Sequence, residues 1–305
     1  MNRAIRIGTR ASPLALVQAE AVRAALISAH ALDPAYCQIV KIVASGDKVQ
    51  DRALAEIGGK VLWTRELDQA LARGEIDMAV HSMKDVETLR PPQFRIAAML
   101  ERADVRDRLI GAPAIVKLRQ GAVVGTASPR RRAQLLRLRP DLNITLLRGN
   151  VATRLAKVES GAVDATLLAA AGLARLGMAI IGTPIPLETM LPAPAQGAIG
   201  VEVRANDARV GGLVAAINHA ETFTCVMAER TLLEALGGSC HSALAALALP
   251  DRAGVHLRAE IYSEDGIEVV RRAITASPDD MAAIRQLGTA MLAEASPRLR
   301  HSFKP

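Results

Sequence analysis

The sequence predicts an α/β fold of two similar, doubly wound domains and a small α+β third domain. A strand, a Gly-Thr pair, a Ser-Pro pair and a helix follow one another twice, in "AIRIGTRASPLALVQAEAVRAALISAH" and in "AVVGTASPRRRAQLLRLR". A second pattern also occurs twice. A helix end, a glycine and an Ile-Asp or Val-Asp pair lead into a strand in "LARGEIDMAVHS" and in "VESGAVDATLLAA". Because both patterns recur in the same order, we expect two halves of similar topology.

Each Ser-Pro pair predicts the start of a helix. A serine at the N-cap accepts a hydrogen bond from the first turn, and proline suits the first helical position because its missing N–H is not needed there. We therefore expect Ser12 and Ser128 to cap helices that begin at Pro13 and Pro129.

Three further segments complete the predicted layout. Residues 44–60 are rich in glycine and charge and predict a mobile loop or lid, whereas the proline-rich residues 182–197 predict a linker or crossover. After about residue 219 we expect a helix that ends at "GGSCHS", two strands joined by an Asp265-Gly266 turn, and a closing helix in "DDMAAIRQLGTAMLAEA". Strands followed by a helix favour a small α+β domain.

The composition limits the classes of function. The 305 residues carry a net charge of +7, which favours an anionic partner, but aromatic residues make up only 2% and disfavour binding of nucleic acid by base stacking. The three cysteines form no CxxC pair, and the adjacent Cys240 and His241 do not have zinc-ligand spacing, so we expect no metal. No signal peptide or apolar run of membrane-spanning length is evident, which predicts a cytoplasmic protein without a membrane partner.

Polar residues gather where the predicted strands end. Ligands of open parallel sheets bind beyond the carboxyl ends of the strands, so we expect a ligand cleft between the two similar domains. Lys84 and Asp85, in "VHSMKD", could form a solvated ion pair. Their position after a buried strand instead favours a pocket, in which a carboxylate can protonate a leaving amine or stabilise a developing cation.

A group of arginines follows the second Ser-Pro pair. Cations at a helix N-terminus oppose the helix dipole, so helix stability does not explain Arg130 and Arg131. Guanidinium groups bind carboxylates in pairs of hydrogen bonds, and Arg148 and Arg154 could join them around a ligand with several carboxylates. A solvated basic face remains the alternative for each arginine, and we favour it for Arg137 and Arg139.

Cys240 allows several interpretations when it is considered alone. It could be a nucleophile, the anchor of a covalent group, or a residue without a chemical role, since the spacing argues only against a metal. A thiol enzyme, a nucleic-acid binder and a non-catalytic two-domain binding protein for a polycarboxylate ligand therefore stay open as alternatives. The last of these is suggested by periplasmic binding proteins, which share the expected pair of α/β domains.

These stretches together resemble the porphobilinogen deaminase family, also called hydroxymethylbilane synthases. The matching segments occur in family order over residues 5–241: "IRIGTRASPLALVQA", "GGK", "ELDQAL", "DMAVHSMKDV", "GTASPRRRAQL", "LRGNVATRL", "LLAAAGLARLG", "LPAPAQGAIGVE" and the cysteine loop. The resemblance implies a monomeric transferase of tetrapyrrole and haem biosynthesis. It implies that four porphobilinogen molecules are condensed head to tail into hydroxymethylbilane, with release of ammonia, on a dipyrromethane cofactor held by a thioether.

The resemblance also implies roles for individual residues. Cys240 matches the cofactor attachment, and Asp85 matches the catalytic carboxylate that assists deamination through an azafulvene-like cation. The positions that match holders of acetate and propionate groups are Arg10, Lys84, Arg130, Arg131, Arg148, Arg154 and Arg175. Smaller contacts match Ser12, Ser82, Thr126, Ser128, Gln196 and Gly197, and the loop over the site matches Lys60 and Trp63.

The family layout implies a discontinuous first domain of residues 1–98 and 196–217. Residues 99–195 would form the second domain and residues 218–305 the third, which carries Cys240. The chain departs from the common family pattern at five positions, of which Trp63, in place of phenylalanine, is one. In the other four, Val61 replaces glycine, Glu87 replaces proline, Pro129 replaces leucine, and His241 replaces glutamine or arginine.

Overall fold

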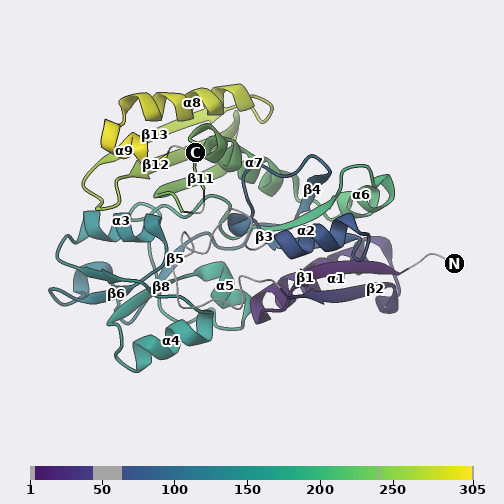
Figure 1. Cartoon of the computed structure of the whole chain (residues 1–305), viewed down its shortest axis with the longest axis horizontal. Coiled ribbons are helices and arrows are strands. Elements are labelled where there is room, and N and C mark those ends of the chain that lie inside the picture. The colour runs from purple at the N-terminus through teal and green to yellow at the C-terminus, as the bar shows by residue number, and fades with distance from the viewer. Residues whose placement is uncertain (1–3, 44–63, 240, 304–305) are drawn as a thin grey trace. The chain divides into compact units, whose positions relative to one another are not determined.

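The computed structural model describes residues 4–43, 64–239 and 241–303 (Figure 1). The chain divides into two compact units. Of the described residues, unit 1 comprises 4–43, 64–103 and 197–223, and unit 2 comprises 104–196, 224–239 and 241–303. The predicted loop of residues 44–60 lies outside the described residues, as do Lys60, Trp63 and Cys240.

Unit 1 is built on a mixed sheet of five strands in the order β2-β1-β3-β10-β4. The strands are β1 (Ile5–Arg10), β2 (Cys37–Ile42), β3 (Met78–Ser82), β4 (Phe94–Met99) and β10 (Ile199–Arg204). Strand β1 pairs in parallel with β2 and β3, whereas β10 runs antiparallel to β3 and β4. The carboxyl ends of β1 and β3 therefore meet at one edge of the sheet, where the chain continues into the two predicted polar turns.

Helices cover both faces of this sheet. They are α1 (Pro13–His30), α2 (Arg65–Ala72) and α6 (Ala208–Ala215). Apolar residues of α1 and α6 pack on one face with Met78 and Val80, and α2 packs on the other face with Ala79. The alternation along β3 thus buries both faces of the strand. Ser12 caps α1 and accepts a hydrogen bond from the N–H of Ala15, as predicted.

Unit 2 contains a second five-stranded sheet with the same pattern, in the order β7-β6-β8-β5-β9. Its strands are β5 (Asp107–Ile110), β6 (Val123–Gly125), β7 (Asn143–Thr145), β8 (Ala165–Ala169) and β9 (Thr183–Pro184). Strand β6 is parallel to β7 and β8, and β5 is antiparallel to β8 and β9. The prediction of two similar α/β halves is confirmed. The antiparallel fourth strand of each sheet was not predicted.

The helices of this half are α3 (Pro129–Leu138), α4 (Val151–Glu159) and α5 (Ala170–Arg175). Leu135 of α3 packs on one face of the sheet, whereas Val151 and Leu173 of the other two helices pack on the opposite face. Ser128 caps α3 and accepts from the N–H of Arg131, which confirms the second predicted helix start. The proline-rich residues 182–197 contain only the two-residue strand β9.

The last part of the chain forms a three-stranded antiparallel sheet in the order β11-β12-β13. Its elements are α7 (Ala220–Ala235), β11 (Leu244–Asp251), β12 (Gly254–Tyr262), β13 (Val269–Ala276), α8 (Met281–Glu294) and α9 (Pro297–His301). The turn between β12 and β13 holds Gly266 at φ +71°, a left-handed conformation that suits glycine. The α+β prediction is confirmed, but β11 was missed. The exact limits of three domains stay a prediction.

One face of the small sheet packs on α7 and α8, and the other packs within unit 2 against α3 and the crossover. Tyr262 and Ala245 of the sheet share a buried cluster with Ala133 of α3 and Leu191. The N–H of Ala246 also donates to the carbonyl of Pro192 at 3.1 Å. These contacts explain why this sheet belongs to unit 2.

Candidate active site

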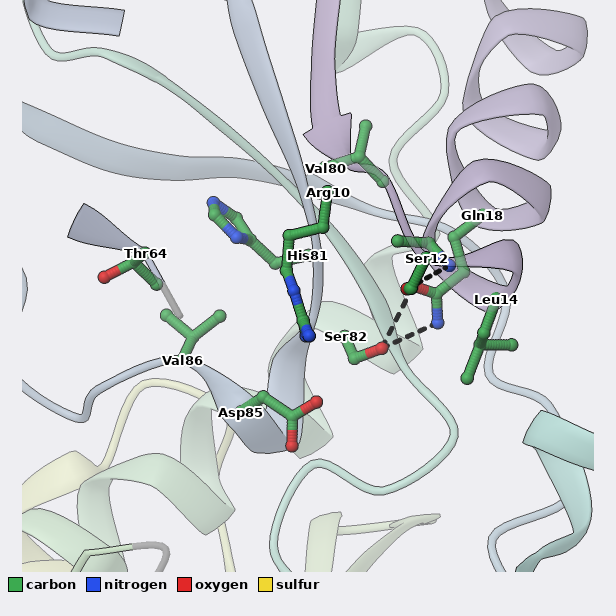
Figure 2. Close-up of a pocket in the computed structure, with 11 residues that line it drawn as sticks. Arg10, Ser12, Leu14, Gln18, Thr64, Val80, His81, Ser82, Asp85 and Val86 are labelled. Carbon is green, nitrogen blue, oxygen red and sulfur yellow. Dashed lines mark hydrogen bonds between the residues drawn. The ribbon is translucent and has the colours of Figure 1, made fainter. Parts of the chain in front are cut away.

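A small cavity lies in unit 1 where β1 and β3 end. Its volume is about 60 Å³. Arg10 at the end of β1 and Ser12 in the following turn border it, as do Ser82 at the end of β3 and Asp85 in the turn after that strand (Figure 2). Two parallel neighbouring strands therefore bring together four residues that the sequence predicted as site residues. The remaining lining residues are Leu14, Ala15, Gln18, Thr64, Val80, His81 and Val86.

Asp85 ends a short 3-10 turn, Met83–Asp85, directly after β3. The N–H of Met83 donates to the carbonyl of Ala198 at 3.1 Å, and Met83 itself is buried, so the turn is fixed to the start of β10. Figure 2 shows the carboxylate of Asp85 and the guanidinium of Arg10 directed into the same space. Lys84 is half-buried on the same turn.

Gln18 contacts the site from α1 and was missed in the sequence. Its side-chain amide holds the hydroxyl of Ser82, with Nε2 at 2.7 Å and Oε1 at 3.0 Å from Oγ (Figure 2). Gln18 is 2% exposed, and a buried polar side chain requires such a partner. Gln18 lies on the buried stripe of α1 with Ala15, Ala19 and Val22, so a polar residue at this helical spacing was a signal that the sequence analysis did not use.

A second cluster lies in unit 2, where Asp107 accepts hydrogen bonds from both predicted arginines of α3. Arg131 donates to Asp107 through Nη2 at 2.7 Å and Nε at 3.2 Å, and Arg130 donates through Nη2 at 2.9 Å. All three side chains are nearly inaccessible to solvent. Burial alone would raise the pKa of Asp107, but the two guanidinium groups hold it well below its usual range.

Gln196 completes this cluster. Its Nε2 donates to Oδ1 of Asp107 at 2.9 Å and to the carbonyl of Val105 at 2.7 Å. Thr126 and Ser128 form the adjacent turn, in which the N–H of Ser128 donates to the Thr126 hydroxyl at 3.1 Å. Asp107 was not predicted, because the run "ERADVRDR" mixes acids and arginines and does not indicate which acid is buried.

The other predicted cations lie near helix ends in unit 2. Arg148 precedes α4 and is half-buried, and Arg154 in its first turn donates through Nε to the carbonyl of Gly149 at 2.9 Å. Arg175 ends α5, and burial lowers its pKa. Arg139, which was expected on a solvated face, pairs with Asp141 at 2.7 Å and has a side chain that is 19% exposed.

Gly197 needs a conformation that only glycine adopts easily. Its φ is +88°, and a Cβ atom there would lie 2.6 Å from the carbonyl oxygen of Ala103. Gly197 therefore has a structural reason to be glycine, beside its predicted contact role.

The residues on both sides of Cys240 are described, although Cys240 is not. The N–H of Ser239 donates to the Ser242 hydroxyl at 3.0 Å, and the N–H of His241 donates to the Ser239 hydroxyl at 3.2 Å. Burial lowers the pKa of His241. The other cysteines, Cys37 and Cys225, are buried in the apolar cores.

Two family models match the chain. The one described as "Porphobilinogen deaminase, dipyromethane cofactor binding domain" covers residues 5–211, and "Porphobilinogen deaminase, C-terminal domain" covers residues 223–295. The chain belongs to the porphobilinogen deaminase family. Its function is that of a transferase which condenses four porphobilinogen molecules into hydroxymethylbilane, releases ammonia and uses a dipyrromethane cofactor.

Relatives with the family name extend over almost the whole chain. The porphobilinogen deaminase of Sphingopyxis alaskensis is 57% identical over 305 residues, which cover 98% of this chain and 96% of that protein. The porphobilinogen deaminase of Paracoccus denitrificans is 51% identical over 269 residues, which cover 87% of this chain and 86% of that protein.

Two solved structures are similar at a lower level. Lipoprotein Tp32 from Treponema pallidum gives a TM-score of 0.45 at 13% identity, covering 73% of this chain and 95% of that one. An ABC transporter periplasmic substrate-binding protein from Coxiella burnetii gives a TM-score of 0.44 at 16% identity, covering 72% of this chain and 94% of that one. Neither likeness bears on what this chain binds.

The residues present fit the family's dipyrromethane cofactor. The group carries acetate and propionate carboxylates, so it needs cationic donors. In the described part of the chain, Nε of Arg130 is buried and has no hydrogen-bond acceptor, although its Nη atoms bond Asp107, Gln134 and the Leu191 carbonyl. Two guanidinium groups share one carboxylate, which leaves the cluster positively charged. A carboxylate group of the cofactor near this cluster would balance the remaining positive charge.

No described helix has both the length and the apolar character needed to cross a bilayer. Nor do the described side chains include three or more histidines, cysteines or acids placed to hold a metal ion.

Proposed function

We propose that Asp85 is the catalytic carboxylate of this chain and that Cys240 holds its cofactor. The observation that carries the first assignment is the shared cavity, into which Asp85 and Arg10 both point. A cation and an anion at the edge of one sheet suit a substrate that itself carries both charges.

Porphobilinogen has two carboxylates and an aminomethyl group. Arg10 would hold a carboxylate through its guanidinium fork, which orients the ring over the cavity. Asp85 would face the methylene carbon or the ring nitrogen as ammonia leaves, because a fixed carboxylate stabilises the positive charge that develops there. Ser82 and Ser12 would supply the smaller contacts of this pocket.

The cationic residues of unit 2 would hold further acetate and propionate groups. Two carboxylates are added with each ring, so the need for guanidinium groups grows as the product lengthens. When bound, dipyrromethane supplies the pyrrole to which the first substrate ring is joined. The cationic residues assigned here are Arg130, Arg131, Arg148, Arg154 and Arg175, with Lys84 on the Asp85 turn, and the smaller contacts are Thr126, Ser128, Gln196 and Gly197.

Further assignments belong to this proposal. The protein acts as a monomer in the cytoplasm and binds neither nucleic acid nor membrane. Aromatic residues make up only 2% of the chain, which disfavours binding of nucleic acid by base stacking. Lys60 and Trp63, outside the described residues, would belong to a loop over the site.

An Asp85→Asn variant tests the central role. The amide keeps the size of the side chain but loses the charge, so we expect turnover to fall by about 100-fold or more. Glu20→Gln, an exposed carboxylate on α1, is the matched control and should keep wild-type turnover. Intact mass must show that both variants carry the cofactor. Normal turnover by cofactor-loaded Asp85→Asn would remove Asp85 from the mechanism.

A further inference from the structure

A buried network of charged residues lies beside the cavity in unit 1. At its centre, Glu202 of β10 is fully buried. His81 of β3 approaches one carboxylate oxygen, with Nε2 3.0 Å from Oε2. Arg90 donates to both oxygens, through Nε to Oε1 at 2.8 Å and through Nη2 to Oε2 at 3.0 Å. A buried carboxylate with two such partners is held in one position.

The strand register explains how His81 reaches Glu202. Strands β3 and β10 are antiparallel, with His81 opposite Gly200 and Ala79 opposite Glu202. His81 and Glu202 are thus diagonal neighbours on one face of the sheet. Burial would raise the pKa of Glu202, but hydrogen bonds from His81 and Arg90 lower it to about 2. Because the carboxylate is ionised, Nε2 of His81 carries the proton of this bond.

Arg90 joins the other end of the turn to the same carboxylate. Its Nη1 donates to Oε2 of Glu87 at 2.6 Å and to the hydroxyl of Thr64 at 3.2 Å, and its Nη2 donates to Oδ1 of Asp68 at 2.5 Å. The five N–H groups of the guanidinium thus meet five acceptor contacts, two of them on Glu202. Glu87 is fixed a second time by the Thr64 hydroxyl, at 2.9 and 3.0 Å.

These contacts enclose the segment that presents Asp85. His81 precedes this turn and Glu87 follows it, and both are connected to Glu202, one directly and one through Arg90. His81 and Thr64 also line the cavity, so the network borders the site directly. We propose that Arg90, Glu87 and Glu202 are positioning residues, which fix the Asp85 turn in its reactive geometry. This inference rests on the proposed role of Asp85.

Glu87 provides the sharpest test, because its removal leaves Arg90 paired with Glu202 and Asp68. A fixed carboxylate matters most in the transition state, so we expect Glu87→Ala to lower kcat about tenfold while KM changes less than about threefold. Glu87→Gln keeps an oxygen that accepts from Arg90, and its kcat should stay within about twofold of the wild type. All variants are compared as folded, cofactor-loaded protein, checked by thermal unfolding and intact mass.

Arg6→Met is the matched control for loss of stability. Arg6 pairs with the buried Asp77 just before β3, at the end of the strand away from the turn. The control should lower the melting temperature at least as much as Glu87→Ala but keep kcat. Arg90→Met should lower kcat further than Glu87→Ala, provided that thermal unfolding shows it folded.

Three results would overturn the positioning role. They are an unchanged kcat in Glu87→Ala, an equal loss in Glu87→Gln, and an equal loss in Arg6→Met. Asp85→Asn in the same assay separates the two proposals. If it is inactive while Glu87→Ala is normal, only the positioning role fails, whereas an active Asp85→Asn removes the role of Asp85 itself.

Discussion

Asp107 and Arg131 form a two-contact buried ion pair, with Nη2 2.7 Å from Oδ1 and Nε 3.2 Å from Oδ2. Arg130 shares Oδ2 at 2.9 Å, so one carboxylate orients two guanidinium groups. The pair connects β5 to α3, whose N-terminus would otherwise disfavour two cations. The arginines assigned to ligand carboxylates are therefore already oriented within unit 2.

Asp107→Asn should be strongly destabilising. The amide cannot balance two buried guanidinium groups, and breaking a buried ion pair by removing one partner costs about 3–5 kcal/mol. Urea unfolding measures the loss. Asp164→Asn is the matched control, because Asp164 pairs with the mostly exposed Arg119 and should lose less. Equal losses in the two variants would contradict the importance of the buried pair.

Stability should fall in acid because of Glu202. Its pKa is about 2 in the folded protein, against 4.5 for the free side chain. Because the pKa of Glu202 is lower in the folded protein, its contribution to the free energy of unfolding is complete above pH 4.5 and is lost as the pH falls toward 2. The shift corresponds to about 3 kcal/mol.

Urea unfolding between pH 6 and pH 3 measures this slope, at pH values chosen to span about 1.5 units on each side of the free-acid pKa. Asp107, whose pKa is also lowered, contributes in the same direction. Glu202→Gln should therefore flatten the curve without abolishing the slope. The same slope in that variant would show that Glu202 is not the group responsible.

Gly197→Ala should destabilise the chain by about 1–3 kcal/mol, since alanine is strained at positive φ and meets the Ala103 carbonyl. Gly212→Ala is the control. Gly212 is exposed on α6 and a Cβ atom there meets nothing within 4 Å, so alanine should be neutral or stabilise by up to about 1 kcal/mol. Thermal unfolding compares the two, and a greater loss at Gly212 would contradict this account.

Local signals predicted much of the fold. The two Ser-Pro helix starts, the two repeated patterns and the Asp265-Gly266 turn each depend on residues close together in sequence, and all are present. The antiparallel strands β5 and β10 were missed because they pair with distant segments. Strand β11 was missed because its run of alanine and leucine has no alternation that separates a strand from a helix.

The sequence predicted the part of the candidate site that lies at strand ends, but not the part that depends on contacts between distant segments. Arg10, Ser12, Ser82 and Asp85 lie at or just beyond the carboxyl ends of two neighbouring parallel strands, so the sheet brings them together. Asp107 depends on contacts between elements that periodicity does not report. Glu202 left a signal that was not used, because a lone acid within "IGVEVR" must find a buried partner. The cleft expected between the two similar domains stays a prediction.

Intact mass of the purified protein tests the central claim most directly. We predict a mass above the sequence mass by two condensed porphobilinogen units, and the bare sequence mass, without activity, for Cys240→Ser. Iodoacetamide on the unfolded wild type should then modify Cys37 and Cys225 but not Cys240, because a thioether has no thiolate to react. A fully active protein at its bare sequence mass, with three alkylated cysteines, would contradict the account.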